Sequence, residues 1–188
     1  MAKIAVVYHS GYGHTASLAR AVKEGAERIP GTHVDLVPVE EAEQKWEILN
    51  AADAMIFGAP TYMASASAPF KAFMDASSKL WAKQAWKDKI AAGFTNSASQ
   101  SGDKLNTLID MMLFAMQHSM IWVSLGLMPG NNSTTGAPTD LNRIGSYVGA
   151  MAQSNSDQGP EQAPPDADRQ TAAFLGERVA KLAARMKD

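Results

Sequence analysis

The sequence predicts an α/β fold of three layers, in which a five-stranded parallel sheet lies between two layers of helices. Five short apolar segments alternate along the chain with segments of helical periodicity, which is the pattern of βαβ units. These apolar segments are nearly continuous, as expected of strands that helices cover on both faces. With 188 residues, of which 46% are hydrophobic, the chain is long enough to bury a core. We therefore expect a single domain over residues 1–188.

The first two expected strands flank a helix. Residues 3–8 (KIAVVY) form the first strand, and residues 15–28 form a helix whose apolar side chains recur every three or four positions. The pair Pro30-Gly31 ends this helix. Residues 32–39 form the second strand, and Pro38 favours an edge position for it because proline cannot donate a hydrogen bond to a neighbouring strand.

The middle of the chain repeats the alternation. Residues 54–59 (AMIFGA) form the third strand, and Pro69 suits the first turn of the helix that follows. Residues 89–95 (KIAAGFT) form a fourth strand. Apolar positions between residues 105 and 116 give the next helix at regular spacing, and residues 120–125 (MIWVSL) form the fifth strand.

The last third of the chain is rich in loops. Residues 129–140 contain Gly, Asn and Thr without a periodic pattern. Residues 153–168 contain no large apolar side chain, so we expect them to form a surface loop. Residues 169–186 form a final amphipathic helix that packs on the sheet.

Composition excludes several classes of function. The 17 Lys and Arg against 19 Asp and Glu give a net charge of −2, which lacks the basic excess of a nucleic-acid or anionic-membrane protein. The absence of Cys excludes disulfides, thiolate metal sites and Cys nucleophiles. No apolar segment approaches the ~18 residues of a membrane span, and nothing in the sequence is typical of a signal peptide. We expect a cytoplasmic protein with no nucleic-acid or membrane partner.

Residues 6–19 (VVYHSGYGHTASLA) contain the strongest functional signal. A strand leads into a turn rich in glycine and hydroxyl groups, and the turn opens a helix whose first N–H groups are unpaired. Such a site suits a phosphate even without a Lys or Arg. The stretch also satisfies the dinucleotide fingerprint from Gly11 through Gly13 to Ala16. However, His9 and Ser10 separate the strand from the first glycine, which favours a terminal phosphomonoester over a pyrophosphate.

The same residues resemble the flavodoxin phosphate loop. That pattern has two aliphatic residues, an aromatic residue (Tyr8), and then Ser10, Gly13, Thr15 and Ala19 at fixed offsets. Within the flavodoxin-like FMN proteins, the chain is most similar to the NAD(P)H:quinone oxidoreductases of the WrbA type. That resemblance rests on residues 58–62 (GAPTY), 67–75 (SAPFKAFMD) and 80–82 (LWA), and extends from about residue 3 to residue 125. It implies a flavodoxin-like sandwich with strand order 2-1-3-4-5.

The resemblance also implies which loops hold FMN. The loops after strands 1, 3 and 4 lie at the carboxyl edge of such a sheet, near its switch point. The first loop takes the phosphate through Ser10, Gly11, Tyr12, Gly13, His14 and Thr15. The second lies beside the isoalloxazine ring with Pro60, Thr61, Tyr62 and Met63, where the family reads Pro-Thr-Arg-Phe-Gly. The third meets the polar edge of the ring with Asn96, Ser97, Ala98, Ser99, Gln100 and Ser101, in place of a run of glycines.

Further residues are implied for the substrate. The family has a His-His pair at the end of the helix that follows the third loop, and this chain has Gln117 and His118. Together with Trp81, these residues are expected to contact a nicotinamide or quinone ring. The resemblance implies a homotetramer, or at least a homodimer, in which Trp81 reaches over the flavin of a neighbouring subunit. We expect no metal, because His9 and His14 have no carboxylate or Cys beside them in the sequence.

Three functions remain open from the sequence. The first is an FMN enzyme that takes two electrons from NAD(P)H and passes them to a quinone-like acceptor. It needs no catalytic side chain of its own because the flavin carries the chemistry. The second is a non-enzymatic flavodoxin that carries single electrons between proteins, although such carriers are usually strongly acidic. The third is a regulatory protein of the same fold that has lost the flavin.

Overall fold

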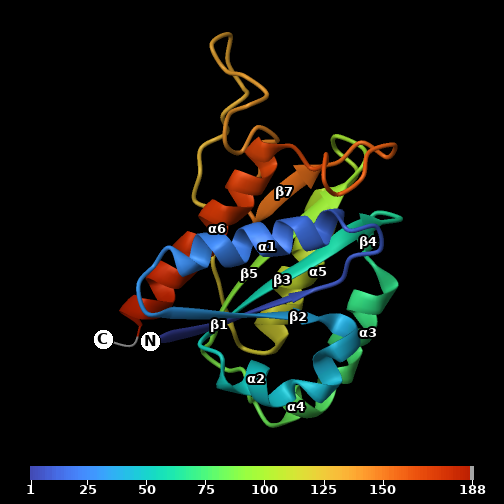
Figure 1. Cartoon of the computed structure of the whole chain (residues 1–188). Coiled ribbons are helices and arrows are strands. Elements are labelled where there is room, and N and C mark those ends of the chain that lie inside the picture. Colours follow the sequence, from blue (N-terminus) through green and yellow to red (C-terminus); the bar gives the residue numbers. More distant parts are fainter. Residues whose placement is uncertain (187–188) are drawn as a thin grey trace.

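The computed structural model describes residues 1–186 and contains the expected parallel sheet (Figure 1). Its strands follow the order β2-β1-β3-β5-β6, and all of these pairs are parallel. The bounds are β1 Ala2–Tyr8, β2 Thr32–Pro38, β3 Ala54–Tyr62, β5 Ile90–Ser97 and β6 Ile121–Trp122. Since β4 Ser65–Ala66 only forms a hairpin with β3, this is the predicted order 2-1-3-4-5, with β2 at the edge as Pro38 indicated.

The fifth position in the sheet differs from the prediction. The expected strand over residues 120–125 is wrong beyond Trp122, because β6 pairs only with the first part of β5. A second segment, β7 Ala150–Gln153, pairs with the rest of β5. Val123 and Leu125 are nevertheless buried, so the apolar pattern indicated burial rather than a continuous strand. The chain between β6 and β7 includes a loop that projects from the body (Figure 1).

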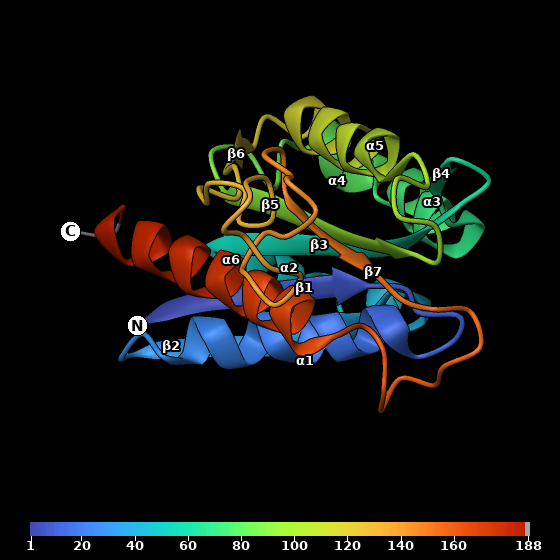
Figure 2. The same ribbon diagram turned by 90° about the horizontal axis from the view of Figure 1, so that it is seen from above.

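Two layers of helices cover the sheet (Figure 2). On one face lie α1 His14–Glu27 and α6 Asp166–Arg185, which begins three residues earlier than expected. On the other face lie α2 Trp46–Ala51, α3 Ala68–Ala76, α4 Ser78–Ala82 and α5 Lys104–Gln117. A short 3₁₀ helix, η1 Val39–Gln44, follows β2. Alternate residues of the central strands contribute to two separate cores, one under each helical layer.

Helices α1 and α6 pack unusually closely. A Cβ atom on Gly176 would overlap the carbonyl oxygen of Val22, and one on Gly25 would overlap that of Ala173. Each helix therefore needs a glycine where the backbone of the other crosses it. No helix among residues 1–186 combines the length and the apolar character needed to cross a bilayer.

A cluster of aromatic side chains fills the core under α3 and α5, and it includes a histidine. His118 is only 2% exposed, and its ring stacks on Trp86 with ring centroids 4.3 Å apart. Its Nε2 lies 2.9 Å from Ser77 Oγ, and that hydroxyl donates to the carbonyl oxygen of Met74 at 2.7 Å. Nε2 must therefore carry the proton, while Nδ1 has no partner among the described residues. Burial lowers the pKa of His118 from 6.5 to about 4.

This buried ring predicts that acid destabilises the fold. In the unfolded chain His118 takes up a proton as the pH falls below 6.5, whereas the folded chain takes it up only near pH 4. Stability from this group is thus complete above pH 6.5 and is lost as the pH falls toward 4. The loss amounts to about 3 kcal/mol. Urea unfolding at pH 7.5 and at pH 4.5 measures it.

The His118→Phe variant serves as the control. Phenylalanine keeps the stack on Trp86, and Ser77 still donates to Met74. We expect this variant to lose clearly less stability between the two pH values than the unmodified protein. Equal losses in both proteins would show that His118 is not the titrating group.

Candidate functional site

The carboxyl ends of β1, β3 and β5 open into a cavity of about 740 Å³. The loops after all three strands line it, together with a segment after β7. Most of the predicted cofactor residues are among its lining: Ser10, Gly11, Tyr12, His14, Thr15, Pro60, Thr61, Tyr62, Met63, Asn96, Ser97, Ala98 and Ser99. Gly13 supports the first loop without lining the cavity. Gln100 and Ser101 instead line a separate cavity, which they share with Lys104 and Arg143.

The first loop presents backbone N–H groups to this cavity. Gly13 precedes α1 with a φ of +88°, a conformation that favours glycine, and the ring of Pro160 leaves no room for a side chain there. Ser10 Oγ accepts hydrogen bonds from the N–H groups of Gly13 (3.1 Å) and Ala16 (3.0 Å) and thereby curls the loop.

Four N–H groups of this loop have no partner among the described residues, those of Gly11, Tyr12, His14 and Thr15. They lie at the start of a helix of 14 residues, where the dipole favours an anion. Thr15 is a buried residue that lines the cavity, and its hydroxyl makes no hydrogen bond within residues 1–186. Among residues 1–186, no Lys, Arg, Asp or Glu lines the cavity. This set of neutral donors fits a phosphate group.

The second loop provides flat, largely apolar surfaces. Tyr62 and Tyr12 lie edge to face with ring centroids 6.4 Å apart, and burial raises the pKa of the Tyr62 phenol. Met63 and Ala64 form the tight turn between β3 and β4, both at positive φ (47° and 67°), and Met63 is 99% exposed. Below them, the buried Thr61 hydroxyl bonds those of Thr95 and Thr107 and so ties β3 to β5 and α5. Thr61 therefore has a structural role in addition to lining the cavity.

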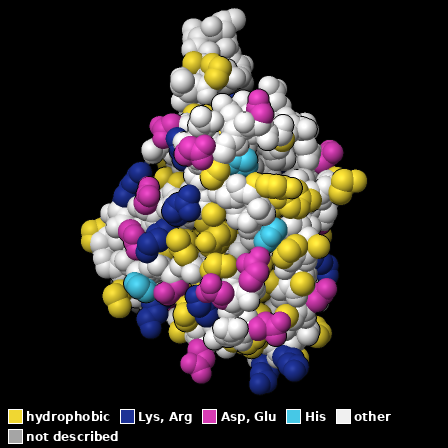
Figure 3. Space-filling view, turned by 45° about the vertical axis from the view of Figure 1, so that its right-hand side comes forward, with side chains coloured by type: hydrophobic (Ala, Val, Ile, Leu, Met, Phe, Trp, Pro, Cys, Tyr) yellow, Lys and Arg dark blue, Asp and Glu magenta, His cyan; other side chains and the backbone are white. Residues whose placement is uncertain are grey.

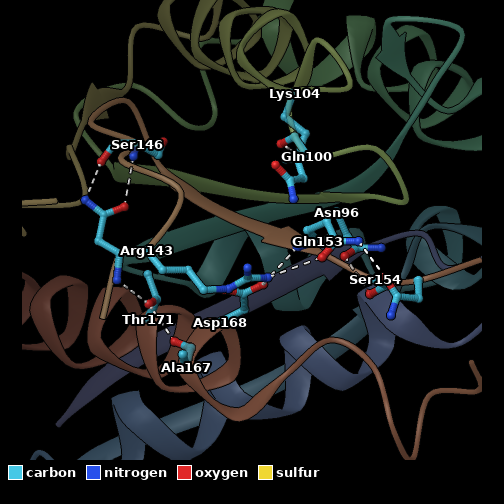
Figure 4. Close-up of polar contacts among 12 residues, drawn as sticks. Asn96, Gln100, Lys104, Arg143, Ser146, Gln153, Ser154, Ala167, Asp168 and Thr171 are labelled. Carbon is cyan, nitrogen blue, oxygen red and sulfur yellow. Dashed lines mark hydrogen bonds and ion pairs between the residues drawn. The ribbon is translucent and has the colours of Figure 1, made fainter. Parts of the chain in front are cut away.

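The third loop and the segment after β7 hold each other in place (Figure 4). Ser154 donates from its hydroxyl to Asn96 Oδ1 (2.8 Å) and from its N–H to the Ser97 carbonyl (3.0 Å). The Gln153 side chain donates to the carbonyl of Ala98 (2.9 Å). Across the cavity, His14 Nε2 lies 2.8 Å from the Gln158 carbonyl. This segment therefore bridges the first and third loops.

Several lining residues were not predicted: Ala64, Gly102, Ser154, Ser156, Gln158 and Gly159. Residues 153–168 do run along the surface as expected, but part of that segment also walls the cavity. Ser, Gln and Gly are common in ordinary loops, so their sequence gave no sign of this role. His9 is a buried neighbour of the site whose Nδ1 lies 2.8 Å from Ser67 Oγ.

The three predicted substrate residues lie together, but away from the first cavity. Trp81, Gln117 and His118 line a second cavity of about 440 Å³ between α3, α4 and α5. It shares no lining residue with the first cavity, although Ala64 of the first cavity and Ser65 of the second are neighbours in the chain. Trp81 is 43% exposed, whereas His118 is enclosed in the core. Within one chain, the structure does not bring these residues to the first cavity.

On the face in Figure 3, basic and acidic side chains are interspersed among neutral ones. A net charge of −2 agrees with this distribution. The site therefore relies on local donors rather than on a strong field over the surface.

Comparison with known proteins gives a consistent family. Residues 32–134 match the family described as NADPH-dependent FMN reductase. The chain is 45% identical to Flavodoxin FldP of Pseudomonas aeruginosa over 97% of both chains. It is 33% identical to an NAD(P)H dehydrogenase (quinone) of Archaeoglobus fulgidus, over 99% of this chain and all of the relative.

A solved structure agrees with these relatives. The crystal structure of a flavodoxin, WrbA-like protein from Agrobacterium tumefaciens superposes with a TM-score of 0.77 at 43% identity, covering 98% of this chain and 99% of the other. These matches confirm the resemblance noted in the sequence, the flavodoxin-like fold and FMN as the family's cofactor. The chain belongs to the flavodoxin-like FMN proteins of the WrbA type, in the NADPH-dependent FMN reductase family.

Proposed function

We propose that this chain is an NAD(P)H-dependent quinone reductase that holds FMN in the 740 Å³ cavity. The observation that carries the proposal is the set of unpaired N–H groups at the start of α1, in a cavity without charged side chains. The N–H groups of Gly11, Tyr12, His14 and Thr15, with the Thr15 hydroxyl, would hold the phosphate. When bound, FMN supplies the transfer of two electrons from a reduced nicotinamide to the acceptor.

The other two loops would hold the ring of the cofactor. Tyr62 and Tyr12 offer aromatic surface at the mouth of the cavity, and aromatic faces pack well on a planar ring. Asn96 and Ser99 offer amide and hydroxyl groups along the wall that the third loop forms. These side chains bind and orient the ring and exclude water from it, and no acid or base among the lining residues is needed.

Assembly of several subunits would explain why the predicted substrate residues lie away from the flavin cavity of their own chain. Trp81, Leu113 and Met116 expose 43%, 56% and 51% of their surface on α4 and α5. Exposed large apolar side chains on neighbouring helices are typical of a subunit interface. We propose a homotetramer in which the second cavity of one subunit faces the flavin cavity of another. Trp81 would then cover the neighbour's ring and form a slot for a flat nicotinamide or quinone.

An electron carrier is the second candidate function, favoured by the name of the Pseudomonas relative. The relative from Archaeoglobus, an NAD(P)H dehydrogenase (quinone), favours the enzyme. Quinone reduction by NAD(P)H distinguishes the two candidates, because a carrier needs protein partners to receive and deliver its electrons. Catalytic turnover with small molecules alone supports the enzyme, and its absence in FMN-loaded protein contradicts it.

The Thr15→Val variant tests the phosphate site. Valine has the shape of threonine, and the Thr15 hydroxyl has no partner to lose within the described chain. A hydrogen bond to a charged group contributes about 1.5–3 kcal/mol, so the Kd for FMN should rise roughly ten- to hundredfold. Riboflavin, which lacks the phosphate, should bind both proteins alike. Thr134→Val, on the exposed loop, is the control. Equal weakening of both ligands would contradict the assignment.

The Trp81→Ala variant tests the shared site. We expect quinone reduction to fall at least tenfold, because Trp81, which lines no part of its own chain's flavin cavity, would no longer complete the slot over the neighbour's ring. Association into tetramers, measured by sedimentation, should weaken as well. Met128→Ala removes another exposed apolar side chain, which lines neither cavity, and should change neither property. A monomer at micromolar concentration, or full activity of Trp81→Ala, would refute the shared site.

A further inference from the structure

Lys104, the first residue of α5, has an ammonium group enclosed by the third loop. The residue is 1% exposed. Its Nζ donates to Ser97 Oγ, to the carbonyl of Ser99 and to the carbonyl of Gln100, each at 2.8 Å. A protonated lysine has three donors and no acceptor, so these three oxygens satisfy it completely. Such a buried cation is retained only where its partners are in place.

The loop in turn depends on this cation. The carbonyls of Ser99 and Gln100 converge on one point, which is unfavourable for their dipoles unless a positive charge lies between them. The Ser97 hydroxyl also points inward, donating to the Ser99 carbonyl at 2.9 Å. The third loop of this chain, which lacks the glycines expected from the family resemblance, is therefore held by hydrogen bonds from Lys104.

The cation lies one layer of residues behind the flavin cavity. Ser97 and Ser99, which bond it directly, line that cavity, whereas Lys104 itself lines the separate cavity on the other side of the loop. Figure 4 shows Lys104 beside Gln100, next to the strand end that carries Asn96. A positive charge at this place acts on whatever charge develops in the flavin cavity, across the single layer of residues formed by Ser97 and Ser99.

Nearby carboxylates do not cancel this charge. Asp168 on α6 is paired with Arg143, whose Nε and Nη2 donate to it at 2.7 and 2.8 Å, and it also accepts from the N–H of Gln153. Asp168 and Arg143 thus form an almost neutral unit with opposite effects on Lys104. Asp103 precedes Lys104 in the chain, but no carboxylate among residues 1–186 forms an ion pair with the Lys104 ammonium.

We propose that Lys104 is a positioning residue that shapes the third loop and stabilises the negative charge which bound FMN acquires on reduction. Two electrons and one proton from NAD(P)H convert the neutral oxidised ring into an anion and leave NAD(P)⁺. A cation behind the loop favours that product and so raises the reduction potential of the cofactor. The proposal rests on the FMN site proposed above.

The charge on Lys104 gives the effect a pH dependence. Burial lowers the pKa of Lys104 to about 8, with Asp168 raising it and Arg143 lowering it. A neutral amine donates only twice, so above this pH the Ser97 hydroxyl must turn from the Ser99 carbonyl toward the lysine nitrogen. The stabilisation of reduced FMN is therefore present below pH 8 and lost above it.

Potentiometric titration of FMN-loaded variants tests the proposal. In Lys104→Met at pH 6.5, we expect the reduction equilibrium to shift about tenfold toward oxidised FMN, a potential lower by about 30 mV. At pH 9.5 the variant and the unmodified protein should agree. Lys89→Met is the matched control, because Lys89 also donates to two backbone carbonyls and has a burial-lowered pKa, but precedes β5 at the opposite edge of the sheet. Its potential should not change.

The outcomes separate this proposal from the proposed function. An unchanged potential in Lys104→Met that still binds FMN overturns the role of Lys104 alone. Absence of FMN binding by the unmodified protein overturns both proposals. If Lys104→Met fails to fold, Lys104→Arg provides the test, because arginine stays protonated between pH 6.5 and pH 9.5. We expect the reduction potential of the unmodified protein to show an additional change near pH 8, and this change should be absent from Lys104→Arg. Its persistence in Lys104→Arg overturns the proposal.

Discussion

The parallel register of β1, β3 and β5 is the constraint on which the site depends. Tyr8, the last residue of β1, lies beside Gly58, and Gly58 lies beside Phe94, so all three strands run in one direction, and β3 and β5 continue a few residues past the end of β1. Every loop that follows them must therefore meet at one edge. The close crossing of α1 and α6 holds these two helices together, and part of the segment that precedes α6 walls the cavity.

Charged side chains do not line the first cavity among the described residues, but the Lys104 cation lies directly behind one of its loops. The first loop offers N–H groups and a hydroxyl, which suit a phosphate without a counter-ion. The Lys104 cation lies behind the third loop, where it can act on the ring without touching it. On the two proposals made above, neutral dipoles would bind the cofactor and the buried Lys104 cation would adjust its potential.

The sequence predicted the parts of the fold that have a local pattern. The alternation of apolar segments and helical periodicity predicted the parallel sheet between two helical layers, and the family resemblance implied the strand order. Residues 6–19 placed a strand, a loop and a helix correctly. Val123 and Leu125 were misassigned because burial and strand pairing have the same apolar signature. Ser154 and Lys104 were missed for a different reason. Their roles arise only when β7 and α5 bring them to the third loop, and a serine or a lysine in isolation carries no such signal. The roles assigned to the lining residues stay predictions.

The most direct test is an NMR titration of ¹⁵N-labelled protein with FMN and, separately, with riboflavin. If neutral donors hold the phosphate, FMN should shift the N–H resonances of Gly11, Tyr12, His14 and Thr15 strongly, and riboflavin should not. The N–H groups of Gly13 and Ala16, already bonded to Ser10, should shift less. Equal shifts with both ligands, or shifts that leave this loop untouched, would contradict the phosphate site on which the account rests.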